Sequence, residues 1–136
     1  MKKYDNFQKA LKNLAEAAEV QPPYKPIEQA GLTGLFEICY ELAWKMVKEV
    51  LELHGRIPNK LASPRTVLKL AYQHGMIFDE KGWLELLETR NELARTYNEE
   101  ASLAAIAKIK GEFLPLFASL KEEVDRHWRI EDTDAL

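Results

Sequence analysis

The spacing of apolar residues follows the period of an α-helix through almost the whole chain, and no segment alternates apolar and polar residues for long enough to suggest a strand. The first helical segment is expected from about Tyr4 to Glu19, and Pro22, Pro23 and Pro26 follow it as a stiff connector. Its apolar face consists of Phe7, Leu11, Leu14 and Ala18. The pattern predicts an all-α protein.

The longest helical segment is expected from about Ile27 to His54, about 40 Å at roughly 1.5 Å per residue, which indicates a central strut. Gly31 and Gly34 weaken its first turns and predict an irregular start. Gly55 suits the left-handed residue that ends a helix. The residues expected in the core are Leu35, Ile38, Leu42, Val47, Val50 and Leu51.

Capping residues mark the next two helices. Ser63 followed by Pro64 predicts the start of a short third helix, which Gly75 ends, and Asp79 is expected to cap a fourth. The residues of the third helix that precede Gly75 include Leu68, Leu70, Ala71 and Tyr72.

The last helix is expected to start after Asn98 and to reach about His127. Gly111 and Pro115 should kink or split it, because proline lacks an amide proton and clashes with the preceding turn. Its inward residues are expected to be Ile106, Ile109, Phe113, Phe117, Leu120 and Val124. The segments together predict an up-and-down helical bundle of four to five helices.

Length and composition limit the class of protein. We expect one helical-bundle domain over residues 1–128 and a flexible acidic tail over 129–136. The net charge of -3 argues against a surface shaped throughout for nucleic acid. Cys39 is the single cysteine and is expected to be a small buried hydrophobe, with no metal and no cofactor. Because no run of about eighteen apolar residues occurs, we expect a cytoplasmic protein without a membrane contact.

Arg90 stands in the middle of an apolar stripe on the fourth segment. The other residues of this stripe are Trp83, Leu86, Leu87, Leu93, Ala94 and Tyr97. A guanidinium stays charged at neutral pH, so a packed face holds it only beside a carboxylate, carbonyls, a phosphate or a water-filled groove. An acidic or anionic partner is therefore expected.

Two glutamates one turn apart, Glu37 and Glu41, could supply that partner. Like charges at this spacing are mildly destabilising unless a cation faces them, and Arg90 or Arg95 is the candidate. Glu41 could also form a surface pair with Lys45. A structural ion pair and a ligand-binding group are equally compatible with this pattern. The apolar ladder beside the glutamates, expected in a core or an interface, is Phe36, Tyr40, Trp44 and Val47.

Three stretches carry a resemblance to a known family: FEICYELAWK at 36–45, SPRTVLKLAYQHGMI at 63–77 and TRNELARTYNE at 89–99, with Trp83 between the last two. In this order they resemble the nucleotidyltransferase substrate-binding proteins, a branch of the HEPN (higher eukaryotes and prokaryotes nucleotide-binding) superfamily. The resemblance covers nearly the whole chain. It implies an HEPN-like bundle, commonly a homodimer, that binds a minimal nucleotidyltransferase encoded beside it in prokaryotes. Several such pairs behave as toxin and antitoxin.

The resemblance also implies a site formed by an arginine, four residues, a histidine, one residue and a tyrosine. Arg90 and Tyr97 fill its ends, whereas Arg95 replaces the histidine. In RNA-cleaving relatives the arginine positions phosphate and the histidine assists proton transfer. Arginine has no neutral form at pH 7, so family-type ribonuclease activity is not expected, although Arg95 could still hold a phosphate. Some partner transferases add AMP to the tyrosine, which makes Tyr97 a candidate acceptor.

Three functions remain open. The first is a non-catalytic adaptor of a minimal nucleotidyltransferase, with a groove that binds a nucleotide, a phosphate or RNA. The second is a ribonuclease toxin with a degenerate site at Arg90 and Arg95, neutralised by the transferase. The third is a structural homodimer whose polar residues satisfy one another. The groove residues expected for the adaptor are Arg90, Asn91, Arg95, Tyr97, Glu37 and Glu41.

Overall fold

The computed structural model describes residues 1–57, 62–96 and 98–129, and every regular element within these ranges is helical. Helix α1 spans Lys2–Ala17 and α2 spans Pro26–Leu53; α3 spans Pro64–Gln73 and α4 spans Glu80–Arg95. The final helical stretch consists of α5 (Glu99–Lys108), a π-helical segment η1 (Ile109–Phe113), α6 (Leu114–Glu123) and a second π-helical segment η2 (Val124–Trp128). The predicted all-α class is confirmed.

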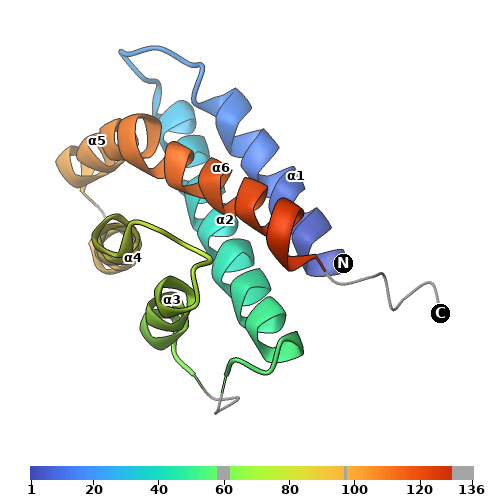
Figure 1. Cartoon of the computed structure of the whole chain (residues 1–136). Helices are drawn as coiled ribbons and strands as arrows, with labels where there is room; N and C mark the ends of the chain where they lie inside the picture. Colours follow the sequence, from blue (N-terminus) through green and yellow to red (C-terminus); the bar gives the residue numbers. More distant parts are fainter. Residues whose placement is uncertain (58–61, 97, 130–136) are drawn as a thin grey trace.

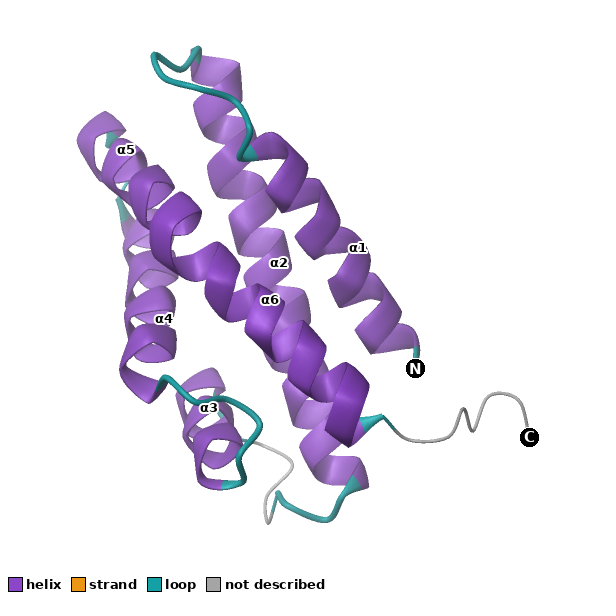
Figure 2. Ribbon diagram, turned by 45° about the horizontal axis from the view of Figure 1, so that its top comes forward, coloured by secondary structure: helices purple, strands orange, loops and turns teal. Residues whose placement is uncertain are grey.

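Helix α2 runs through the centre of the bundle. Helix α1 lies along one side of it and α6 passes across its front, whereas α3 and α4 lie on the side away from α1 (Figures 1 and 2). The most extensive helix contact joins α1 to α2, and α2 also touches α3, α4 and α5. The longest helix is therefore the central element of the bundle, as its length predicted.

An aromatic cluster fills the centre of the core. Phe36 of α2 stacks on Phe113 of η1, with ring centroids 5.6 Å apart. Phe117 of α6 makes edge-to-face contacts with two further rings, Phe7 of α1 at 6.2 Å and Trp83 of α4 at 5.6 Å. Phe36 also lies 6.3 Å from Phe117, and all five rings are buried, so one cluster joins five helical elements.

The buried face of α2 differs in part from the predicted one. Val47, Val50 and Leu51 are buried, and Leu35 and Leu42 are half-buried. Ile38 is 52% exposed, so its assignment to the core was wrong. Phe36 and Tyr40 hold the buried face, and a residue two positions from each of them projects about 200° away around the helix.

The start of α2 is regular, and the predicted irregularity was wrong. The helix is continuous from Pro26, which occupies its first turn. The Lys25 amide donates to the Glu28 carboxylate at 2.7 Å, which fixes this end. The capping and proline effects outweigh the weak helix propensity of Gly31 and Gly34.

The predicted caps of the following helices are confirmed. The Ser63 hydroxyl accepts from the Thr66 amide at 3.3 Å, and the Asp79 carboxylate accepts from the Gly82 amide at 2.9 Å. Gly55 and Gly75 take the left-handed conformation, with φ of 68° and 77°. In α3, Leu68 and Ala71 are buried and Leu70 is half-buried, whereas Tyr72 is 46% exposed.

The last helix is split where glycine and proline predicted. The Leu114 amide donates to the Ile109 carbonyl five residues back, which is the π-helical spacing, and Pro115 follows without an amide proton. The six predicted inward residues of this helix are all buried. Asn98 caps its start through hydrogen bonds from the amides of Glu100 and Ala101 at 2.8 and 3.2 Å.

Residues 130–136 of the predicted acidic tail lie outside the described residues. Cys39 is fully buried, as predicted, and burial raises the pKa of its thiol to about 12. Within the described ranges, no helix is long and apolar enough to cross a bilayer.

Candidate functional site

Of the two glutamates that could pair with Arg90, Glu41 is the one that does so. The guanidinium on α4 donates to the carboxylate on α2 at 3.2 Å, and its central carbon lies 5.4 Å from the centroid of the Tyr40 ring. The Arg90 and Glu41 side chains are 32% and 34% exposed. The cation is therefore held by a charge on one side and an aromatic face on the other, at the edge of the core.

Glu41 receives donors from its own helix as well. The indole N–H of Trp44 donates to its carboxylate at 3.3 Å, and the Lys45 ammonium lies 3.5 Å from the same oxygen. The predicted surface pair with Lys45 thus exists beside the pair with Arg90. Three donors meet at one carboxylate, which fixes its position.

Arg90 is not fully satisfied by these contacts. One terminal nitrogen donates to the Asn91 amide oxygen at 3.5 Å, a long bond, and the buried Nε makes no hydrogen bond within the described residues. Because this atom is buried, an anionic oxygen would reach it only if the side chain moved.

Tyr40 lies under Arg90 as a neutral phenol. Burial, with a smaller effect of the Glu41 carboxylate, raises its pKa to about 12 against the opposing effect of the Arg90 guanidinium. At neutral pH this ring supplies a face for the cation, not a base.

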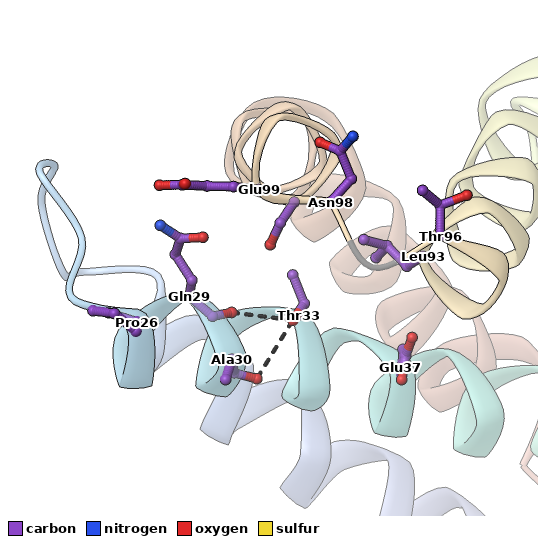
Figure 3. Close-up of a pocket in the computed structure, with 10 residues that line it drawn as sticks. Pro26, Gln29, Ala30, Thr33, Glu37, Leu93, Thr96, Asn98 and Glu99 are labelled. Atoms are coloured by element: carbon purple, nitrogen blue, oxygen red, sulfur yellow. Dashed lines mark hydrogen bonds between the residues drawn. The ribbon is translucent and has the colours of Figure 1, made fainter.

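Beside this pair, a cavity of about 310 Å³ opens between the first turns of α2, the end of α4 and the start of α5 (Figure 3). Its polar lining comes from Gln29, Thr33 and Glu37 of α2, Thr96 after α4, and Asn98, Glu99 and Ser102. Pro26, Ala30 and Leu93 supply apolar walls. The volume is at the lower end of the range for small-molecule sites.

Glu37 faces this cavity and not Arg90. It lies one turn before Glu41 on α2 and shares the cavity wall with Leu93, one turn after Arg90 on α4. Glu37 belongs to no ion pair with a cation among the described residues. The two glutamates therefore lie in different surroundings: Glu41 pairs with Arg90, and Glu37 lines the cavity.

Arg95 lies on another face of α4. It donates to Glu92, three residues earlier, at 3.1 Å, and its side chain is 67% exposed. It lines a second cavity, of about 320 Å³, between α4 and α5. Residues five positions apart are separated by about 140° around a helix, so the side chains of Arg90 and Arg95 leave α4 in different directions. Tyr97 lies outside the described residues.

The structure thus brings Arg90, Asn91 and Glu41 together. It places Glu37 in the adjacent cavity and Arg95 on the far side of the helix. Sequence reasoning missed the cavity itself, because Gln29, Thr33 and Asn98 meet through the packing of α5 on α2. Asn98 was recognisable as a cap, but no local pattern shows which helix a capped end faces.

Solved structures share this all-α bundle. A Thermus thermophilus protein, ttk003001694, superimposes with a TM-score of 0.73 at 29% identity, over 91% of this chain and 99% of that one. Haemophilus influenzae HI0074 superimposes with a TM-score of 0.76 at 24% identity, over 90% and 99% of the two chains. Its structure was described as revealing the fold of a substrate binding domain of a nucleotidyltransferase.

The chain belongs to the nucleotidyltransferase substrate binding protein like family, whose model matches residues 2–126. It is also 30% identical over 82 residues to the probable ribonuclease HepT of Haemophilus influenzae strain Rd. That match covers 59% of this chain and 56% of the relative, so the chain spans little more than half the length of this curated relative.

Proposed function

We propose that this protein is a non-catalytic substrate-binding subunit that pairs with a minimal nucleotidyltransferase, in a toxin–antitoxin-like pair. Its membership of the nucleotidyltransferase substrate-binding family supports the pairing. The observation that carries the non-catalytic assignment is Arg95, which replaces the motif histidine and pairs with Glu92 on an exposed face.

The chemistry of RNA cleavage supports the same assignment. Transfer of the 2′-hydroxyl proton needs a group that changes protonation near neutral pH, and a guanidinium does not. The three histidines lie elsewhere: His54 contacts Trp128, His74 ends α3, and His127 lies in η2. Neither cavity beside α4 has a histidine among its described lining residues.

The ligand groove of the proposed subunit centres on Arg90 and Asn91. The Arg90 side chain is about one-third exposed, so its guanidinium can donate to an anionic oxygen, and the Glu41 carboxylate holds it in place. A phosphate or a nucleotide is the ligand class that fits this donor. Tyr97 is proposed as the residue to which the partner transferase adds AMP.

The proposed subunit is a homodimer. Ile38 stands 52% exposed in the middle of the longest helix, with the half-buried Leu35 and Leu42 one turn to either side. An apolar strip of this kind on the central helix is suited to burial against the same strip of a second copy.

A ribonuclease toxin is the second candidate, and the similarity to the probable ribonuclease HepT favours it. In that case Arg90 and Arg95 would act on RNA and the transferase would inhibit cleavage.

An RNA cleavage assay separates the two candidates. We expect the wild-type protein, Arg95→His and the control Arg95→Lys to leave labelled single-stranded RNA intact. Cleavage by the wild type would establish the ribonuclease. Cleavage by Arg95→His alone would show a ribonuclease site that lacks one residue, and would contradict a surface built only for binding.

A further inference from the structure

The cavity between α2, α4 and α5 is negatively charged. Glu37 and Glu99 line it, and no lysine or arginine is among its described lining residues. Neither glutamate pairs with a cation in the part of the chain that the structure describes. Two carboxylates without counter-charges favour a cationic occupant over a phosphate.

The threonine hydroxyls of the cavity have already used their protons. Thr33 donates to the Gln29 carbonyl at 3.0 Å, and Thr96 donates to the Glu92 carboxylate at 3.2 Å. Both hydroxyl oxygens are left with lone pairs, which accept from a ligand N–H. The first amides of α5 offer no row of donors to an anion, because the Asn98 side chain already accepts from two of them.

The two carboxylates lie at opposite ends of the cavity. Glu37 lies at the end with Leu93 and Thr96, and Glu99 lies at the end with Pro26 and Gln29 (Figure 3). Gln29 and Glu37 are eight residues apart on α2, which is roughly 12 Å along the helix. Between them the wall is formed by Ala30 and Thr33.

We propose that this cavity binds a linear aliphatic polyamine. One terminal ammonium pairs with Glu37 and the other with Glu99, and the amine between them donates to the hydroxyl oxygen of Thr33. The methylene groups lie against Ala30 and Leu93. The site is separate from the Arg90 groove and does not depend on the proposed function.

Titration of the intact protein with spermidine, followed by NMR and by calorimetry, tests the site. We expect a dissociation constant on the order of 1 mM or lower, with amide shifts centred on Thr33, Glu37 and Glu99. Cadaverine, which lacks the central amine of spermidine, should bind more weakly than spermidine. Pentylamine, which also lacks the second terminal ammonium, should bind more weakly still. Pentanoate should not bind.

Three isosteric variants locate the charges. Glu37→Gln and Glu99→Gln should each weaken spermidine binding about tenfold. Glu16→Gln is the matched control: Glu16 is an exposed residue of α1 outside the cavity, and the variant should change spermidine binding less than about twofold. Shifts spread over the whole acidic surface, equal binding of pentylamine and spermidine, or an equal loss in Glu16→Gln would overturn the proposal.

Discussion

The guanidinium of Arg90 donates to the carboxylate of Glu41 at 3.2 Å and joins α4 to the central helix α2. Both side chains remain about one-third exposed, so water screens the pair and its contribution to stability is modest. The same carboxylate also holds Trp44 and Lys45, so the pair positions Arg90 as well as balancing its charge.

Removing the charge of Glu41 should destabilise the protein slightly. We expect Glu41→Gln to lower the free energy of unfolding by about 1 kcal/mol in urea denaturation, because Arg90 keeps its charge without a counter-charge. The control Glu92→Gln removes the partner of exposed Arg95 and should change stability by less than about 0.5 kcal/mol. Equal losses in the two variants would show that the Arg90 pair has no special structural role.

Lys110 of η1 links the connector between α1 and α2, residues 18–25, to the last helical stretch through hydrogen bonds. Its ammonium donates to the Val20 carbonyl and to the Tyr24 hydroxyl, the latter at 2.6 Å, and lies 4.8 Å from the Tyr24 ring centroid. Lys110→Met should therefore speed amide hydrogen exchange in residues 18–21, 24 and 25, by about fivefold. Lys108→Met is the control, because Lys108 pairs with Glu85 and does not touch the connector. Unchanged exchange in Lys110→Met would contradict the role of this contact.

Stability should fall at alkaline pH through two buried acids. Burial raises the pKa of Cys39 from 9.0 to about 12, and raises that of Tyr40 from 10.0 to about 12. The unfolded chain therefore loses these protons first, so stability is complete below about pH 9 and declines as pH rises towards 12. In urea denaturation, the stability of Cys39→Ala should decline less between pH 9 and pH 10 than that of the wild type, because the unfolded thiol, with a pKa of 9.0, ionises ahead of the unfolded tyrosine, with a pKa of 10.0. A parallel decline in both proteins would contradict the buried thiol's contribution.

The exposed strip on α2 predicts the oligomeric state. The wild type should elute as a dimer in size-exclusion chromatography with light scattering, and Ile38→Glu should be monomeric, because it places charges in the proposed interface. Ile27→Glu, at a residue 78% exposed near the start of α2, should leave the dimer intact. A monomeric wild type would rule out the dimer, and a dimeric Ile38→Glu would exclude this strip as its interface.

Most of the fold was predictable because its signals are local. Ser63, Asp79 and Asn98 cap helices by hydrogen bonds to residues two or three positions away, and Pro115 breaks a helix through its own missing proton. Such effects do not depend on the rest of the structure.

The errors have a tertiary cause. Ile38 is apolar and helical in spacing, but the buried face of α2 is the one that carries Phe36, on which Phe113 of η1 packs. The Arg90 pair was predictable because a charged group in a packed face requires a partner. The different surroundings of Glu37 and Glu41 were not predictable from the sequence, because they depend on the position of α5 beside α2.

Capture of the tagged protein from its native host, with bound proteins and nucleic acid both identified, tests the proposed pairing most directly. We predict near-stoichiometric recovery of a small nucleotidyltransferase. The intact mass of the chain in that complex would then show whether Tyr97 carries AMP. Recovery of RNA without any transferase would contradict the adaptor assignment and favour the ribonuclease.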